Sequence, residues 1–215
     1  MKKILFLILF TSINTYQLIA KSNNESIVDS LLTIINSTKN DTHKLNSLST
    51  IAQKYWSINP PEGLPYATKA LDLAKKMKWK SKICEAYGVL GMNYVILSDN
   101  VKGTLNLEKS LALAKEIKDY KKIALASGAL GNLYYFQSNL PLAIDYYLIS
   151  LRASEKSNSK NEMAAALSNI GVIYSDMKEL DRALTYFEKA LKIHTETGFK
   201  IYQAINMTNI GKIYH

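Results

Sequence analysis

Four glycines recur along this chain at one constant interval, and their neighbours recur with them. A tyrosine follows three residues after each glycine, and a leucine or isoleucine stands one residue before it. The four pairs are Gly91 with Tyr94, Gly131 with Tyr134, Gly171 with Tyr174, and Gly211 with Tyr214. A period of this length, about 40 residues, is the signature of stacked, similar units and not of one central core.

A second set of positions repeats in the same frame and shows that each unit holds two segments. Leucine recurs after a small residue at Ala70-Leu71, Ser110-Leu111, Ser150-Leu151 and Ala190-Leu191. Between the two sets lies a short polar break, SDMKELDR in the best repeat, so each unit is predicted to be helix, turn, helix. Glycine in a helix interior costs about 1 kcal/mol relative to alanine, so the repeated glycines indicate close helix-to-helix approach.

The repeated residues resemble the tetratricopeptide repeat family, whose unit has Leu-Gly, Tyr, Ala, an aromatic residue and Ala at set offsets. The best match has Ile170-Gly171, Tyr174, Ala183, Phe187 and Ala190, and the preceding one has Leu130-Gly131, Tyr134, Ala143, Tyr147 and Ser150. A weaker match begins at Leu90-Gly91 and Tyr94. The resemblance covers residues 43 to 215 and implies an all-α fold, a right-handed solenoid of antiparallel helix pairs.

The resemblance also implies which residues pack the repeats together, and it has two departures. The implied packing residues are Gly91, Tyr94, Gly131, Tyr134, Ala143, Gly171, Tyr174, Ala183, Phe187, Ala190, Gly211 and Tyr214. The period is longer than the usual period of the family, which is about 34 residues. The proline that commonly ends the second helix is replaced by Lys115, Glu155 and Thr195, which predicts longer second helices.

The repeat frame predicts the boundaries of the units. Repeats are expected at about 43–80, 81–120, 121–160 and 161–200, with a half unit at 201–215, and residues 21–42 are expected to form a leading helix that covers the first repeat. In the first repeat, Pro60 and Pro61 predict a turn over Ser57 to Pro65, with the second helix beginning at Tyr66. The later helices are expected at Ser81–Leu97, Thr104–Ile117, Lys121–Gln137, Leu142–Lys156, Asn161–Met177, Asp181–Thr195, and from Lys200 onward.

Residues 1–20 have the pattern of a secretory signal peptide. Two lysines precede a short apolar run, Ile4 to Phe10, and the segment ends in Ala20. Because a bilayer span needs about 20 apolar residues, this run favours a signal peptide over a membrane helix. We therefore expect an exported, periplasmic or otherwise extracytoplasmic protein. The last repeat stops after one helix, which predicts a longer chain that could be tethered to a membrane by its further part.

The charge of the chain does not indicate a nucleic-acid partner. The formal charge is +9, but the lysines gather where second helices end, and there they complement the helix dipole and solvate the surface. No arginine cluster accompanies them, so we expect no nucleic acid and no membrane contact by the repeats. Cys84 is the sole cysteine, which excludes an intrachain disulfide.

No arrangement of residues suits catalysis, a metal or a cofactor. The three histidines, His43, His194 and His215, are far apart in the repeat frame and have no ligand set around them. His194 stands at a position that holds Ala74, Ala114 and Ser154 in earlier repeats, and it is expected to be a partly exposed packing residue. We predict that the chain is not an enzyme, has no cofactor and acts on no small-molecule substrate.

The resemblance implies that the first helices of the repeats line a concave groove that binds a partner. Asn169 and Asn209 match an asparagine that, in relatives with extended repeats, often bonds the backbone of a bound peptide. These asparagines could instead belong to the core, and Tyr135 and Phe136 could simply pack on a neighbouring helix. The implied groove residues are Met92, Val95, Ile96, Asn132, Tyr135, Phe136, Ser168, Asn169, Val172, Ser175, Thr208, Asn209 and Lys212.

Two functions are consistent with this sequence. The first is a protein-protein interaction scaffold that holds a peptide, a partner helix or the C-terminal remainder of its own chain. The second is the extracytoplasmic sensory region of a larger bacterial signalling protein with a histidine kinase, nucleotide cyclase or DNA-binding output. A transmembrane run followed by such an output domain would distinguish the second function from the first.

Overall fold

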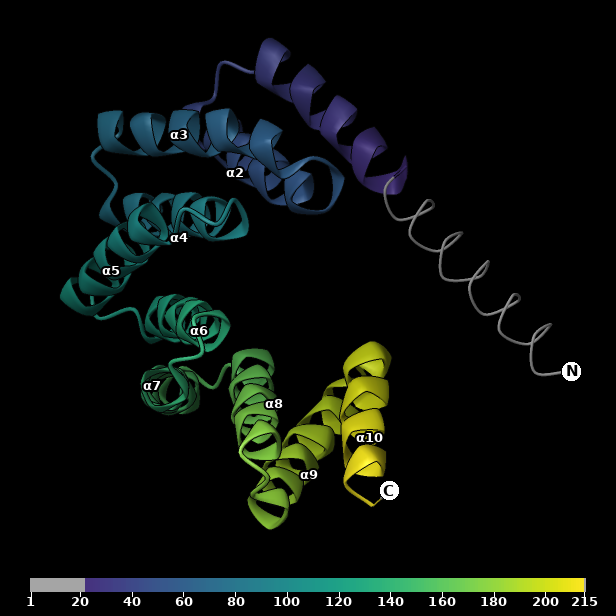
Figure 1. Cartoon of the computed structure of the whole chain (residues 1–215). Helices are drawn as coiled ribbons and strands as arrows, with labels where there is room; N and C mark the ends of the chain where they lie inside the picture. Colours follow the sequence, from purple (N-terminus) through teal and green to yellow (C-terminus); the bar gives the residue numbers. More distant parts are fainter. Residues whose placement is uncertain (1–21, 215) are drawn as a thin grey trace, which may run out of the picture. The chain divides into compact units, whose positions relative to one another are not determined.

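The computed structural model describes residues 22–214 (Figure 1). The predicted signal peptide, residues 1–20, and His215 lie outside this range. All regular structure in residues 22–214 is helical, and consecutive helices pack in pairs. The predicted all-α, solenoid-type fold class is therefore confirmed.

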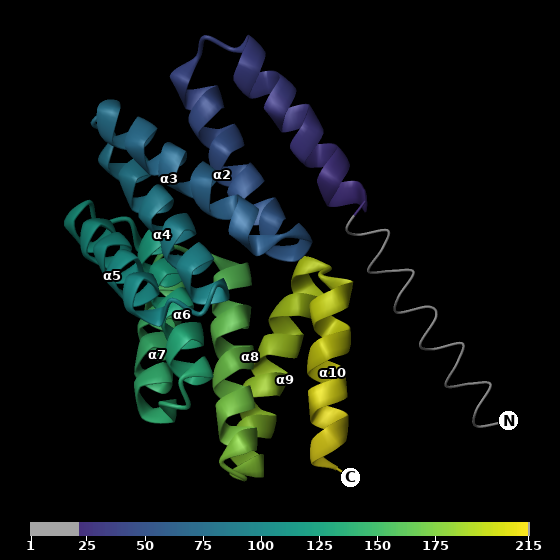
Figure 2. The same cartoon turned by 45° about the horizontal axis from the view of Figure 1, so that its top comes forward.

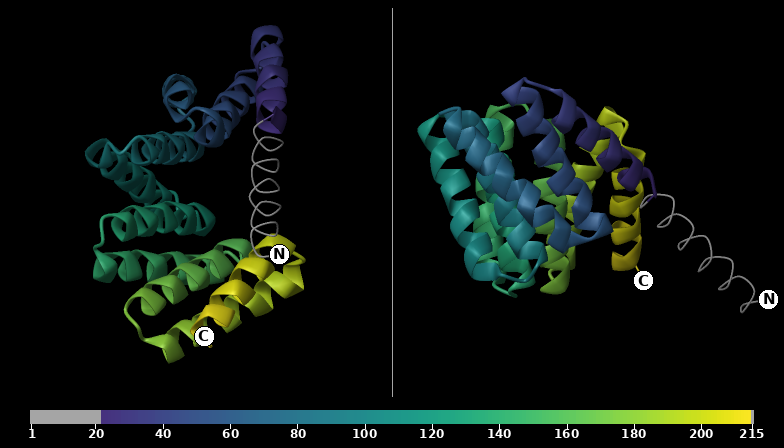
Figure 3. Two further views of the ribbon diagram at one scale, coloured as in Figure 1. Left: turned by 45° about the vertical axis from the view of Figure 1, so that its right-hand side comes forward. Right: turned by 90° about the horizontal axis from the view of Figure 1, so that it is seen from above.

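The helices fall into two compact units, and the chain passes from the first to the second between Asp99 and Asn100. The first contains the helical residues 22–37 and α2 (Asp41–Ile58), α3 (Pro60–Lys76) and α4 (Lys80–Ile96). The second contains α5 (Asn100–Glu116), α6 (Tyr120–Phe136), α7 (Leu140–Lys156), α8 (Lys160–Asp176), α9 (Leu180–Thr197) and α10 (Lys200–Ile213). In the second unit α6 packs on α7, α8 on α9, and α9 on α10; Figures 2 and 3 show α9 and α10 side by side.

The turns between helices explain the constant period of the repeat. One residue of each turn has a left-handed backbone, and these residues are evenly spaced, at Lys78, Ser98, Lys118, Ser138, Asn158, Lys178 and Gly198. In the turn after α6, Ser138 N–H donates to the Tyr135 carbonyl and Asn139 N–H donates to the Tyr134 carbonyl, both at 2.9 Å. This pair of hydrogen bonds is a Schellman motif, which satisfies the last carbonyls of a helix. Helices of equal length joined by identical turns thus set the period, and each helix with its turn is one half-repeat.

The predicted turn in the first repeat is wrong. Instead of a loop over Ser57 to Pro65, α2 runs to Ile58 and α3 begins at Pro60, with Asn59 as the single break. Proline suits the first turn of a helix because the N–H it lacks has no partner there, so Pro60 and Pro61 begin α3 and do not end α2. Pro65 lies inside α3. Most later helices begin slightly earlier than expected, α5 at Asn100 being the largest difference.

Aromatic rings from second helices cover the glycines of first helices in the second compact unit. A Cβ atom added at Gly131 would lie 2.6 Å from the ring of Tyr147, and one added at Gly171 would lie 2.8 Å from the ring of Phe187. Both rings are buried, with 2% and 1% exposure. The alanines implied to pack the repeats, Ala143, Ala183 and Ala190, are fully buried, and Gly91 is buried in the first compact unit.

The remaining implied packing residues lie nearer the surface. Tyr134 stacks on Tyr146 and Tyr174 stacks on Tyr186, with ring centroids 5.3 and 5.5 Å apart, and both Tyr134 and Tyr174 are half-buried. Tyr94 is also half-buried. Tyr214 is 71% exposed, and a Cβ added at Gly211 would meet no described atom within 4 Å.

Candidate functional site

The first helices of successive repeats lie side by side in the second compact unit. Although these helices are far apart in sequence, α8 contacts both α6 and α10. Residues spaced three or four apart on α8 share one helix face, so Asn161, Ala165, Ser168 and Val172 form one stripe. We call the surface formed by α6, α8 and α10 the first-helix face.

A cavity of about 500 Å³ opens on this face between α8 and α10. This volume is within the range of pockets that bind small ligands or side chains of a larger partner. Its wall combines amide and hydroxyl groups with apolar side chains. The lining residues are Asn161, Glu162, Ala165, Ser168, Asn169 and Val172 from α8, His194 from α9, and Phe199, Tyr202, Ile205, Asn206 and Asn209 from α10 and the residue before it.

Hydrogen bonds between side chains fix the polar part of this wall. The Ser168 hydroxyl donates to Asn206 Oδ1 at 2.9 Å, which joins α8 to α10. Asn206 is buried, and its Nδ2 donates to the carbonyl of Tyr202. These bonds leave the Asn206 amide with partners on both its oxygen and its nitrogen, as burial of an amide requires.

A second set of bonds joins α6 to both α8 and α7. Asn169 Nδ2 donates to Asn132 Oδ1 at 3.2 Å, and the Tyr147 hydroxyl donates to the same oxygen at 2.6 Å. Burial raises the pKa of the Tyr147 hydroxyl far above its usual value. Tyr147 therefore stays protonated as the donor that holds Asn132, and Asn132 in turn holds Asn169 at the cavity wall.

His194 is buried, which corrects the expectation that it would be partly exposed. Only 3% of it is accessible, and its ring stacks on Tyr202 with centroids 5.1 Å apart. The His194 carbonyl accepts a bond from Gln203 Nε2 at 2.8 Å. Its Nδ1 is buried with no hydrogen-bond partner in the described part of the chain. Burial lowers the pKa of the ring, so His194 is neutral at pH 7.

The structure brings four of the predicted groove residues together in this cavity. These are Ser168, Asn169, Val172 and Asn209, all half-buried. Asn132 is half-buried and joins them through its bond to Asn169.

The other predicted groove residues lie outside the cavity. Tyr135 donates to Asp176 Oδ2 at 2.8 Å, which raises the pKa of its hydroxyl, and Phe136 is 75% exposed and so does not belong to a core. Ser175 is half-buried, while Thr208 and Lys212 are exposed. In the first compact unit Met92 and Val95 are half-buried and Ile96 is exposed.

Sequence reasoning missed most residues that α10 and the start of α8 contribute. One signal could have found Asn206, because it stands where earlier repeats have Ala86, Ala126 and Ala166, all buried. An asparagine in a buried alanine position needs hydrogen-bond partners, and this points to a polar cluster. None of the others replaces a buried alanine that recurs in the earlier repeats; they are Asn161, Glu162, Ala165, Phe199, Tyr202 and Ile205.

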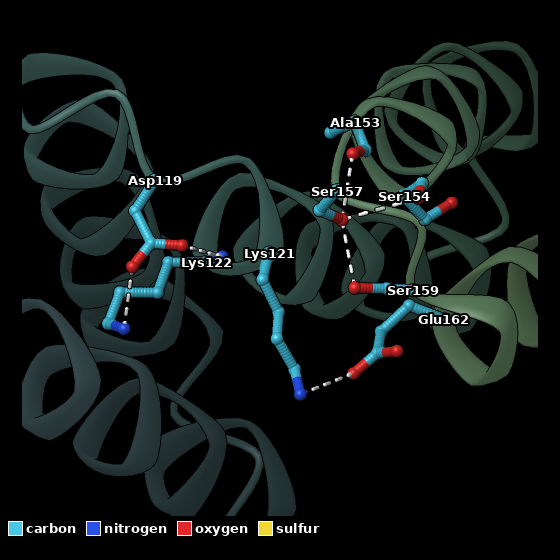
Figure 4. A network of polar contacts seen from close by, with 8 residues as sticks. All are labelled: Asp119, Lys121, Lys122, Ala153, Ser154, Ser157, Ser159 and Glu162. Carbon is cyan, nitrogen blue, oxygen red and sulfur yellow. Dashed lines mark hydrogen bonds and ion pairs between the residues drawn. The ribbon is translucent and has the colours of Figure 1, made fainter.

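Glu162, which Figure 4 shows facing Lys121, is the single carboxylate that the described residues contribute to the cavity wall. Lys121 of α6 reaches it from the neighbouring repeat at 3.9 Å, a distance too long for a strong hydrogen bond. In the same view Asp119 caps α6 by accepting from the Lys122 N–H at 3.1 Å and pairs with Lys122 Nζ at 2.7 Å. Although burial opposes it, these bonds from Lys122 lower the pKa of Asp119.

Residues 22–214 contain neither a metal site nor a membrane span. Within this range no group of three or more His, Cys, Asp or Glu side chains is placed to hold a metal ion. None of the helices described in it combines the length and apolar character needed to cross a membrane.

Comparisons with known proteins point to one family. The tetratricopeptide repeat family matches residues 162–215, and no curated protein matches the chain. Among solved structures, BtubC (BKLC) from P. vanneervenii superposes with a TM-score of 0.69, with 16% identity over 92% of this chain and 83% of that protein. A likeness at this identity shows the fold alone.

Two further structures are similar over most of this chain but are themselves longer. A Rap protein complexed with competence and sporulation factor has a TM-score of 0.79 and 17% identity over 90% of this chain. A signal transduction ATPase from Pyrococcus horikoshii that has a tetratricopeptide repeat sensor has a TM-score of 0.60 and 20% identity over 92%. The chain spans 58% of the first protein and 32% of the second.

Proposed function

The chain belongs to the tetratricopeptide repeat family, and from this premise we propose that it is a non-catalytic scaffold that binds a peptide or a partner helix on its first-helix face. The cavity between α8 and α10 is the observation that carries this proposal. It presents side-chain amides beside apolar surface. This is the combination that a peptide needs, because its backbone requires both donors and acceptors while its side chains require apolar contact.

Asn169 and Asn209 are the residues that we expect to bond the peptide backbone. They are one repeat period apart, line the same cavity and are half-buried, so their amides remain partly accessible at its wall. Asn169 is further oriented by its bond to Asn132. The likeness to a Rap protein that was crystallised with competence and sporulation factor supports a binding role for a chain of this fold.

Display of random dodecapeptides tests this proposal. We expect the chain to enrich peptides that share a pattern, and we expect Asn169→Ala and Asn209→Ala each to weaken an enriched peptide by about 2- to 10-fold, the effect of one lost hydrogen bond. Asn46→Ala is the matched control, because Asn46 is exposed on α2 in the first compact unit. Failure to enrich any peptide, or equal loss with all three variants, would reject the first-helix face as the binding surface.

We also propose that the chain is exported and that its scaffold serves a sensory role in a larger signalling protein. The support is the signal-peptide pattern of residues 1–20 and the likeness to an ATPase whose repeats are described as a sensor. A fusion of residues 1–40 to bacterial alkaline phosphatase tests export, because this reporter is active only outside the cytoplasm. An inactive fusion would reject the proposed extracytoplasmic location and leave the scaffold proposal intact.

A further inference from the structure

The C-terminal part of the repeat array departs from the earlier repeats at two buried positions, and both departures lie at the same cavity. His194 stands where α3, α5 and α7 have Ala74, Ala114 and Ser154, which are fully buried. Asn206 stands where α4, α6 and α8 have a buried alanine. A polar side chain at a buried alanine position stabilises nothing by itself, since its desolvation must be offset by hydrogen bonds. The cavity between α8 and α10 is therefore a specialised part of the repeat array.

Large apolar side chains at the start of α10 remain open to solvent around the cavity. Phe199, Tyr202 and Ile205 are 42%, 52% and 46% exposed. They stand where the preceding repeat has Ser159, Glu162 and Ala165. Aromatic and aliphatic surface on the wall of a cavity favours a ligand group with a flat or apolar body.

The charge on the wall indicates which kind of group this is. Among the described residues Glu162 is the single carboxylate there, its side chain is 18% exposed, and no lysine or arginine lines the cavity. Lys121 approaches Glu162 only to 3.9 Å and is itself 62% exposed. A bound carboxylate would be repelled by Glu162, whereas a cation would gain both this carboxylate and the faces of the aromatic rings. The overall positive charge of the chain opposes the binding of a cation only weakly, because salt screens charges beyond about 8 Å.

A guanidinium group meets these conditions better than an ammonium group. It is planar, so it stacks on aromatic faces, and its fork of N–H donors matches a carboxylate. Its weaker hydration also reduces the cost of entering a half-buried site. We propose that the cavity between α8 and α10 is a subsite for one arginine side chain of a bound peptide, with its guanidinium paired to Glu162 and lying against Tyr202. This inference rests on the proposed function, since it assigns one position of the peptide ligand.

Enriched dodecapeptides provide the first test. We expect arginine at one fixed position, and we expect its replacement by citrulline, which keeps the shape and removes the charge, to weaken binding about 10-fold or more. Glu162→Gln should cause a similar loss and make the arginine and citrulline peptides bind equally. Glu196→Gln is the matched control, because Glu196 pairs with Lys160 on the surface and does not line the cavity.

Replacement of Lys121 should change the affinity for the arginine peptide in the opposite direction. Because Lys121 is the cation that approaches Glu162, Lys121→Met should free the carboxylate and strengthen binding of the arginine peptide by about 2- to 5-fold, while leaving the citrulline peptide unchanged. Thermal unfolding by circular dichroism would establish that Glu162→Gln and Lys121→Met remain folded.

A titration with N-acetyl-arginine amide, followed by backbone amide NMR shifts, separates this inference from the proposed function. We expect shifts confined to the cavity residues of α8 and α10, and none with N-acetyl-citrulline amide. Peptides that are enriched without arginine, or that bind Glu162→Gln as tightly as wild type, would overturn the subsite while the scaffold proposal stands. An absence of enriched peptides would overturn the scaffold proposal, and an absence of shifts with the arginine amide would overturn the subsite.

Discussion

The ring of Tyr147 occupies the space that a side chain at Gly131 would need. A Cβ atom at Gly131 would lie 2.6 Å from both Cδ1 and Cε1 of this ring. Because Tyr147 is buried and its hydroxyl is held by Asn132 at 2.6 Å, the ring cannot move aside freely. The glycine that costs stability within α6 is thus what permits α6 and α7 to approach.

Alanine at Gly131 should therefore be much worse than alanine at Gly211, although both hold the same position in the repeat. At Gly211 an added Cβ would meet no described atom within 4 Å, so the two variants share the gain in helix propensity and differ in overpacking. We expect Gly131→Ala to be less stable than Gly211→Ala by about 1–3 kcal/mol. Urea unfolding of the two variants measures this difference, and equal free energies of unfolding would show that the Tyr147 ring yields.

The left-handed turn residues predict a pair of opposite changes. Lys178 has a φ of 63° without being glycine, whereas Gly198 has a φ of 74° in the equivalent turn. Left-handed backbone costs a residue with a Cβ about 1–2 kcal/mol, so Lys178→Gly should raise the free energy of unfolding and Gly198→Lys should lower it, each by about 1 kcal/mol. No described atom lies within 4 Å of a Cβ at Gly198, so a steric clash would not explain a change there. Changes of the same sign in both variants would contradict this explanation.

Much of the fold could be predicted because the repeat makes each position visible several times. The glycine and tyrosine positions are present in four copies, and the helix pairs follow from them. The first repeat is the exception. Pro60 and Pro61 are compatible with either the end of one helix or the beginning of the next, and in the structure they begin α3.

The candidate site could be predicted only in part, since it depends on residues that depart from the repeat. Asn169 and Asn209 are identifiable because they recur one period apart. The wall formed by Phe199, Tyr202 and Ile205 has no counterpart in the preceding repeat, so no periodic pattern marks it. His194 is visible as a departure in the sequence, but its burial depends on Tyr202, which stacks on it from the next helix.

The burial of His194 predicts a loss of stability in mild acid. Its pKa is lowered in the folded protein by desolvation, so the unfolded chain binds a proton more readily than the folded chain. The contribution of neutral His194 to the free energy of unfolding is complete above the pKa of histidine in the unfolded chain, about 6.5. This contribution is lost as the pH falls from there through the lower pKa of His194 in the folded protein. We expect the free energy of unfolding of the wild type to fall between about pH 7.5 and pH 5 more steeply than that of His194→Ala.

Alanine is a suitable replacement because Ala74 and Ala114 fill the same position in earlier repeats. His43→Ala serves as the control, since His43 lies on α2 in the first compact unit and not at this buried position. If the wild type and His194→Ala had the same pH dependence, the folded protein would have to accommodate a protonated His194.

The bond between Ser168 and Asn206 should couple the stability of α8 to that of α10. It joins two different helices at 2.9 Å, and Asn206 is 1% exposed. Ser168→Ala leaves the Asn206 oxygen without this donor, and Asn206→Ala leaves the hydroxyl without this acceptor, so each single change should cost about 1–2 kcal/mol. With both residues replaced, no partner remains unsatisfied, and the double variant restores the alanine that Ala126 and Ala166 provide in earlier repeats.

We therefore expect the double variant to lose less than the sum of the two single changes, by about 1 kcal/mol, in a double-mutant cycle measured by urea unfolding. Thr208→Ala combined with Asn206→Ala is the control cycle, because the Thr208 hydroxyl bonds the carbonyl of Ala204. Additive losses in the Ser168 cycle would mean that α10 is held to α8 by the apolar contacts of the cavity wall alone. A coupling confined to the Ser168 cycle would identify this bond as one that holds α10 to α8.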